Sequence, residues 1–207
     1  MSKRFKRKIN IREEYTSIYI FTNGEKTEIN YFNDKKSEIR RNDIKIKPEF
    51  INSDPLKLVE KVVEKVIEEI NRENEYWVVF DKDNFDKDFD NAINKAEANG
   101  LKVAYSNEAF ELWFLLHFNP MSSAIDRKDY NIKLTENFRK LTKDKQYKYD
   151  KVESVYPLIK IIKNRESDAI RNAKKLLEQH KKEKSFLKKN PSTTVHLLIE
   201  KLNKLKL

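Results

Sequence analysis

Asp81 and Asp83 are the residues of this chain whose type and spacing are best suited to chemistry. They directly follow the apolar run 77–80, Trp-Val-Val-Phe. Such a run is typical of a buried strand, and ligands gather at the carboxyl ends of strands in open α/β sheets. Mg²⁺ and Mn²⁺ prefer oxygen ligands and are commonly shared with substrate phosphates. The pair therefore predicts a metal site for phosphate chemistry. The alternative, that both aspartates only cap a helix and face solvent, stays open at this point.

Polar groups also follow two other predicted strands. Asn-Gly-Glu-Lys-Thr-Glu at 23–28 comes after the apolar run 17–21, and Ser106 and Asn107 come after 101–105, with Glu111 one turn further on. The carboxyl ends of parallel strands lie along one edge, so we expect these groups near Asp81. Segment 24–27 is not a P-loop, because its lysine does not directly follow a glycine.

The elements that must position these groups alternate along the first part of the chain. Strands are predicted at 17–21, 44–51, 76–80 and 101–105, with Pro48 placing the second at an edge or bulge. Helices are predicted at 26–41, 55–70, 86–99 and 109–118, and after residue 120 at 129–142, 151–163, 166–183 and 192–206, the last capped by Ser192. This order predicts an α/β fold with a mostly parallel sheet flanked by helices, and a helix-rich extension.

We divide the chain into a basic flexible arm at 1–12, an α/β core at 13–120 and a basic helical extension at 121–207. The net charge of +10 is concentrated at the two ends, and the middle is acidic. A nucleic-acid enzyme that grips phosphates at its periphery and binds metal at its centre has this pattern. Solvated helix faces are the alternative explanation of the same charges.

Several classes of protein are excluded or disfavoured by composition. The chain has no cysteine, which excludes disulfides, a thiol nucleophile and a zinc–thiolate site. No apolar run reaches the ~20 residues of a membrane span, so we expect a soluble, cytoplasmic protein that does not contact a membrane. His117, His180 and His196 form no metal-binding pair at helical spacing. His117 is interpreted as a core or rim histidine, whereas His196 is more open to a functional role.

Four segments together resemble the RloB-like family, whose core is a Toprim-type domain. They are Gly24–Glu28 with Tyr31 and Phe32, Val79–Asp83, Ser106–Trp113 and Asn190–His196. They span nearly the whole chain in the order that the family has. The resemblance implies a Toprim-like α/β core, one or two Mg²⁺ or Mn²⁺ ions, and phosphodiester cleavage in nucleic acid. It also implies an effector of anti-phage abortive infection and, for some members, a partner ATPase encoded beside it.

One residue departs from the Toprim pattern, which has a glutamate directly before the glycine that follows the first strand. This chain has Asn23 there, and an asparagine oxygen can ligate a metal but cannot shuttle a proton. Glu25 or Glu28 would then supply the carboxylate. The alternative is a catalytically weakened module that binds nucleic acid or a partner ATPase.

The expected site residues follow from the resemblance and the strand ends together. Asp81, Asp83 and Glu28 are expected to bind metal; Glu25 and Glu28 are candidate general bases, Glu111 is expected to support the site and Lys26 to pair with the scissile phosphate. The residues expected to hold the nucleic-acid backbone are Lys174, Lys175, Lys181, Lys182, Lys188 and Lys189. The substrate class stays open between DNA and RNA, including tRNA, and a homo-oligomer is also compatible with the sequence.

Overall fold

The computed structural model describes residues 16–39, 41, 43–68, 74–152 and 155–206. The predicted basic arm at 1–12 lies outside the described residues. Within them, no helix is long and apolar enough to cross a membrane.

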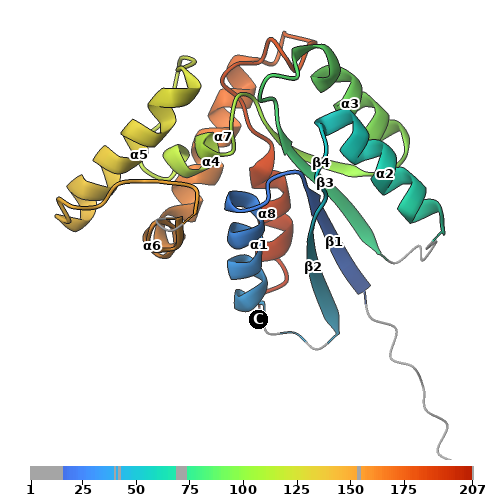
Figure 1. Cartoon of the computed structure of the whole chain (residues 1–207), viewed down its shortest axis with the longest axis horizontal. Helices are drawn as coiled ribbons and strands as arrows, with labels where there is room; N and C mark the ends of the chain where they lie inside the picture. Colours follow the sequence, from blue (N-terminus) through green and yellow to red (C-terminus); the bar gives the residue numbers. More distant parts are fainter. Residues whose placement is uncertain (1–15, 40, 42, 69–73, 153–154, 207) are drawn as a thin grey trace, which may run out of the picture.

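Four parallel strands form one sheet in the order β2-β1-β3-β4. They are β1 (Thr16–Thr22), β2 (Ile44–Phe50), β3 (Glu75–Asp81) and β4 (Lys102–Ser106). The strand containing Pro48 is at an edge, as the missing proline N–H requires. The α/β fold with a parallel sheet is therefore confirmed, and all four carboxyl ends lie at the upper edge of the molecule in Figure 1.

Helices cover both faces of the sheet (Figure 1). The first four are α1 (Thr27–Glu38), α2 (Pro55–Glu68), α3 (Asp86–Ala98) and α4 (Glu111–Leu116). The chain continues through α5 (Arg127–Thr142), α6 (Val155–Ile162), a short 3-10 turn η1 (Lys163–Arg165), α7 (Glu166–Gln179) and α8 (Val195–Asn203).

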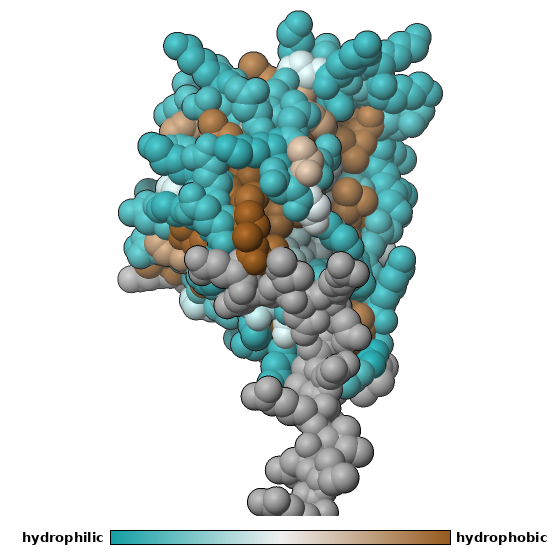
Figure 2. Space-filling view, turned by 90° about the vertical axis from the view of Figure 1, so that its right-hand side faces the viewer, coloured by the Kyte–Doolittle hydropathy of each residue, from teal (hydrophilic) through white to brown (hydrophobic). Residues whose placement is uncertain are grey.

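Alternation along the strands builds two separate hydrophobic cores. Val78 and Phe80 of β3 face α2 and α3, whereas Trp77 and Val79 face the opposite side, where α1, α4, α7 and α8 lie. Figure 2 shows the outer side over α2 and α3, where hydrophilic side chains surround narrow hydrophobic strips. Asp81, two residues after Val79 in the same strand, therefore faces α1 and α4.

The C-terminal segment returns to the sheet and packs against β4. Thr193 forms an antiparallel bridge with Ser106, and their hydroxyl oxygens are 2.9 Å apart. Our prediction of a helix from residue 192 is wrong at its start, because residues 192–194 bond to the end of β4 and α8 begins at Val195. The domain boundary at residue 120 stays a prediction, although α8 itself contacts β4.

Asn107 holds the chain that leads into this segment. Its buried side-chain amide donates to the carbonyl oxygens of Phe186 and Leu187, both at 2.8 Å, and of Lys189 at 3.2 Å. Ser106 and Asn107 thus have a structural role, because their side chains fasten residues 186–194 across the end of β4.

We expect Asn107→Ala to lower the free energy of unfolding by about 2 kcal/mol, because buried carbonyl groups would lose their donor. Equilibrium urea unfolding measures this change. Asn99→Ala is the matched control, since it removes one amide-to-carbonyl bond at an exposed helix end. Equal losses in the two variants would contradict the structural part given to Asn107.

Candidate acidic site at the sheet edge

Asp81 is the last residue of β3 and points to the face that α1 and α4 cover. It follows Trp77 and Val79 at the strand period of two, and it is buried at 7% exposure. The backbone of Phe110, just before α4, donates a hydrogen bond to its carboxylate. The alternation along the strand thus places the Asp81 side chain between the sheet and the helices and not in solvent.

Glu28 lies in the first turn of α1 and its carboxylate lies against the backbone of Gly24. A Cβ atom built on Gly24 would overlap that carboxylate, so only glycine permits this approach. Glu28 is buried, whereas Glu25 and Lys26 precede the helix and are exposed. Of the two candidate general bases, only Glu28 is brought to the end of β3.

Glu111 is the first residue of α4 and is almost completely buried. The Tyr149 hydroxyl donates to its Oε1 at 3.0 Å, and Lys151 Nζ lies 3.2 Å from the same oxygen. Both Glu28 and Glu111 occupy the first turn of a helix, where the helix dipole favours negative charge.

Burial and mutual repulsion raise the affinity of this cluster for protons. Desolvation, followed by the charges of Asp81 and Glu111, raises the pKa of Glu28 to about 8. Desolvation also raises the pKa of Asp81, with Glu111 adding to the rise and Arg127 and Lys151 opposing it. Glu111 is therefore close enough to Glu28 and Asp81 to disfavour the ionisation of both.

Asp83 lies in the turn after β3 and adds a fourth carboxylate at the rim. Its backbone has a positive φ of 49°, which is uncommon for a residue other than glycine. Its side chain pairs with Arg127, the first residue of α5, whose other terminal nitrogen is 3.7 Å from Asp81 Oδ2. We call Glu28, Asp81, Asp83 and Glu111 the acidic centre.

Lys82, between the two aspartates, turns away from the acidic centre. Its ammonium group pairs with Asp86 at 2.8 Å and Glu108 at 3.1 Å. These pairs join the loops that follow β3 and β4, and the backbone N–H of Asp83 also donates to the Glu108 carbonyl at 3.2 Å. The loop that carries Asp83 is thereby held in place.

The donors of the acidic centre fit a hard divalent cation in their chemistry. In the part of the chain that the structure describes, no three Asp, Glu, His or Cys side chains form a ready coordination shell. One further buried oxygen near Glu28, Oδ1 of Asn23, has no hydrogen-bond partner among the described atoms, whereas the Thr27 hydroxyl lies close to that of Tyr149. Unpaired oxygens beside buried carboxylates are the groups that a cation or its water shell would satisfy.

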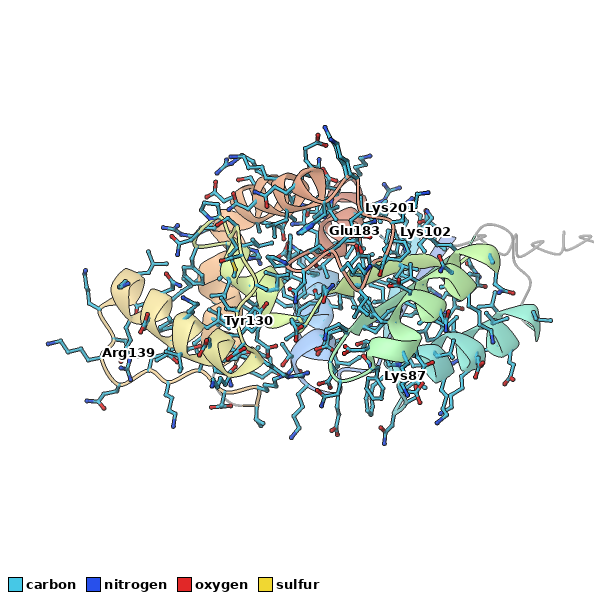
Figure 3. The ribbon with its side chains drawn as sticks, turned by 90° about the horizontal axis from the view of Figure 1, so that it is seen from above. Lys87, Lys102, Tyr130, Arg139, Glu183 and Lys201 are labelled. Atoms are coloured by element: carbon cyan, nitrogen blue, oxygen red, sulfur yellow. The ribbon has the colours of Figure 1, made fainter. Side chains whose placement is uncertain are left out.

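The predicted nucleic-acid-binding lysines divide into two groups. Lys181, Lys182, Lys188 and Lys189 lie in the segment 180–190, which Asn107 fastens beside the end of β4. Lys174 and Lys175 lie on α7, and Lys174 pairs with Glu200 of α8 at 2.6 Å. Figure 3 looks onto the sheet edge, with Glu183 of the 180–190 segment, Lys87 of α3 and Tyr130 of α5 on three sides of it. The first group is thus the one next to the strand ends.

Sequence reasoning missed Arg127, Tyr149 and Lys151, which lie far from the strand-end motifs along the chain. The only available signal was that the segment after residue 120 adds charged and aromatic residues without a motif of its own. The histidines lie outside the acidic centre: His117 contacts the Trp113 carbonyl at 2.9 Å, and burial lowers its pKa to about 3. His196 is buried on α8, and desolvation lowers its pKa as well.

Comparison with protein-family models gives one match, described as RloB-like protein, over residues 18–202. The matched residues include β2, β3, β4, all but the first two residues of β1, and all four members of the acidic centre. A search of curated proteins and a search of solved structures each find no match.

We expect the metal-free protein to lose stability as the pH rises from about 4.5 to about 8. In that window Glu28 keeps its proton in the folded state and loses it in the unfolded state, so unfolding is increasingly favoured. Glu28→Gln should make this fall shallower. Urea unfolding in EDTA at a series of pH values measures it.

Glu25→Gln is the control for this experiment, because Glu25 is exposed and lies three residues from Glu28. Its curve should run parallel to that of the unmodified protein. If Glu28→Gln also runs parallel, the acidic centre does not bury an uncompensated carboxyl group.

Proposed function

Because the chain belongs to the RloB-like family, we propose that it is a metal-dependent nuclease that cleaves phosphodiester bonds in nucleic acid. The observation that supports this most is the burial of Glu28 beside Asp81 and Glu111 at the carboxyl edge of the sheet. Buried carboxylates with strongly shifted pKa values cost stability and cluster at functional sites. We include in the proposal a role as an effector of anti-phage defence, which the family resemblance implies.

In this proposal Asp81, Asp83 and Glu28 hold one Mg²⁺ or Mn²⁺ ion, with the Asn23 side-chain oxygen as a further ligand. A bound divalent ion would supply charge stabilisation to the phosphodiester oxygens. It would also remove the repulsion that raises the pKa of Glu28 and Asp81. Binding of the ion and protonation of the carboxylates therefore compete at the acidic centre.

We assign the transfer of protons to Glu28 rather than to Glu25. Glu28 is buried beside Asp81, whereas Glu25 is exposed, so only Glu28 is placed where a carboxylate could take up a proton next to the ion. Glu111, bound by Tyr149 and Lys151, acts as a positioning residue that keeps negative charge beside Asp81. Lys26 is exposed outside the first turn of α1, so contact with the scissile phosphate would need substrate that reaches that surface.

Nucleic acid is the proposed partner, as DNA or as RNA including tRNA. The lysines of the segment 180–190 lie next to the end of β4, the strand that neighbours β3, whereas Lys174 and Lys175 would extend the contact along α7. Phosphate contacts of this kind weaken steeply with salt. A partner ATPase is a further part of the proposal that rests on the family resemblance alone, and a homo-oligomer is one that the sequence allows.

The second candidate is a module that binds nucleic acid or a partner ATPase without cleaving. Asn23, which stands where the Toprim pattern has glutamate, favours it. The buried carboxyl group of Glu28 favours the nuclease, because a module without chemistry gains nothing from that cost. Calorimetric titration with Mn²⁺ separates the two, since only the nuclease requires the ion.

We expect the purified protein to cleave DNA or RNA with Mg²⁺ or Mn²⁺ and to be inactive in EDTA. Glu28→Gln and Asp81→Asn should each lower the rate by at least about 100-fold, because each removes a proton-transferring or metal-binding group. Gel assays of labelled DNA and RNA at matched protein concentrations measure the rates.

Glu25→Gln is the matched control, since it removes an exposed carboxylate three residues from Glu28. It should keep the rate within about threefold of the unmodified protein. A nuclease activity that survives in Glu28→Gln and Asp81→Asn would show that another site, or a contaminant, performs the cleavage.

A further inference from the structure

Two cations enter the acidic centre from one part of the chain. Arg127 begins α5 and contacts both Asp83 and Asp81, and Lys151 follows α5 and contacts Glu111 at 3.2 Å. Both side chains come from the segment 127–151, which projects away from the sheet and reaches it again at these points (Figure 1).

The charges of the acidic centre are only partly balanced by these cations. Four carboxylates face two basic side chains, so two negative charges stay uncompensated when all groups are ionised. One divalent cation would balance these two negative charges. A site that carries such an ion and binds a phosphate also needs basic groups for the phosphate oxygens.

We propose that Arg127 and Lys151 are the residues that bind the substrate phosphate, and that the carboxylates hold them in place until substrate arrives. This inference rests on the proposed function. If the carboxylates held a divalent ion, Arg127 and Lys151 would be free of these partners and available to bind the phosphodiester oxygens.

The chemistry of Arg127 suits this exchange of partners. A guanidinium group presents paired N–H donors that match a carboxylate and a phosphate equally well. Two terminal nitrogens of Arg127 contact two different aspartates, Asp81 and Asp83. Its guanidinium group therefore faces the acidic centre as a whole and not a single carboxylate. Lys82, in contrast, is 11% exposed, is held by Asp86 and Glu108, and faces away.

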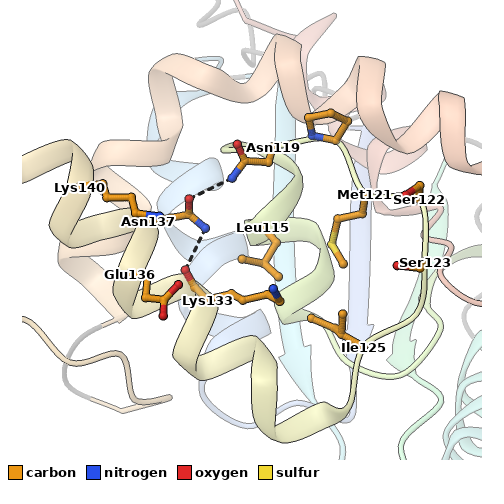
Figure 4. A pocket seen from close by; sticks show the side chains of 11 residues that line it. Leu115, Asn119, Met121, Ser122, Ser123, Ile125, Lys133, Glu136, Asn137 and Lys140 are labelled. Atoms are coloured by element: carbon orange, nitrogen blue, oxygen red, sulfur yellow. Dashed lines mark hydrogen bonds between the residues drawn. The ribbon is translucent and has the colours of Figure 1, made fainter.

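The surroundings of Arg127 leave it room to move. Its side chain is 38% exposed, and that of Lys151 is 42% exposed. The arginine can therefore leave Asp81 and Asp83 without unpacking a core. A cavity of about 320 Å³ lies beneath the segment 119–126, between Leu115, Met121 and Lys133 (Figure 4), and Arg127 is not among its lining residues.

The test compares Arg127→Gln with Lys128→Gln in the full chain. Lys128 is the next residue of α5, and Lys128→Gln removes the same charge as Arg127→Gln. The Lys128 side chain is 78% exposed and pairs with Asp126. Calorimetry measures Mn²⁺ affinity, and fluorescence anisotropy with Ca²⁺ measures the binding of one oligonucleotide, made as DNA and as RNA, over a series of salt concentrations.

In Arg127→Gln we expect Mn²⁺ to bind at least about threefold more tightly, because a competing cation is gone. The oligonucleotide should bind more weakly, with a salt slope lower by about 1. Lys128→Gln should leave Mn²⁺ affinity unchanged. Lys151→Gln should change both affinities in the same directions as Arg127→Gln.

Unchanged or weaker Mn²⁺ binding in Arg127→Gln, or an equal change in Lys128→Gln, would overturn the assignment. The proposed function fails separately: if the unmodified protein binds Mn²⁺ and oligonucleotide as expected yet never cleaves, the nuclease is rejected while the assignment of Arg127 holds. If neither the unmodified protein nor Arg127→Gln binds Mn²⁺, both proposals are overturned.

Discussion

The structure depends on burying more negative charge at the carboxyl edge of the sheet than its own cations neutralise. The Glu28 carboxylate lies against Gly24, where a Cβ atom would overlap it, and desolvation together with the charge of Asp81 raises the pKa of Glu28 to about 8. Glu111 adds to the repulsion, and Arg127 relieves part of it. Such an arrangement costs folding free energy unless a cation or a proton enters, which is why we interpret it as a binding site and not as packing.

The sequence was sufficient to predict the strands, their shared edge and the aspartates after β3, because these depend on local periodicity and on a general property of parallel sheets. It could not separate Glu25 from Glu28, since the choice depends on which residues the first turn of α1 turns inward. Arg127 and Lys151 were out of reach, because their contacts with Asp83 and Glu111 join residues 40 or more positions apart. Pairings of that range are decided by how α5 packs, and no local pattern encodes them.

The polar residues at the end of β4 lie at the predicted edge, and the structure adds a bonding role that the sequence did not indicate. The side chains of Ser106 and Asn107 bond to Thr193 and to the carbonyl oxygens of residues 186, 187 and 189. They fasten the C-terminal segment, and with it the lysines of 180–190, across the end of β4. The motif at 190–196 is thus explained by its bonds to β4, and the edge combines a centre of negative charge with a positively charged border.

The central claim is that the acidic centre is a site for one divalent cation, and a crystal structure of the protein soaked in Mn²⁺ tests it most directly. The account predicts an anomalous-scattering peak within bonding distance of the Asp81 and Glu28 carboxylates, with the Arg127 side chain turned away from Asp81. A structure with no peak at this edge, in which Arg127 still pairs with Asp81 and Asp83 at saturating Mn²⁺, would contradict it.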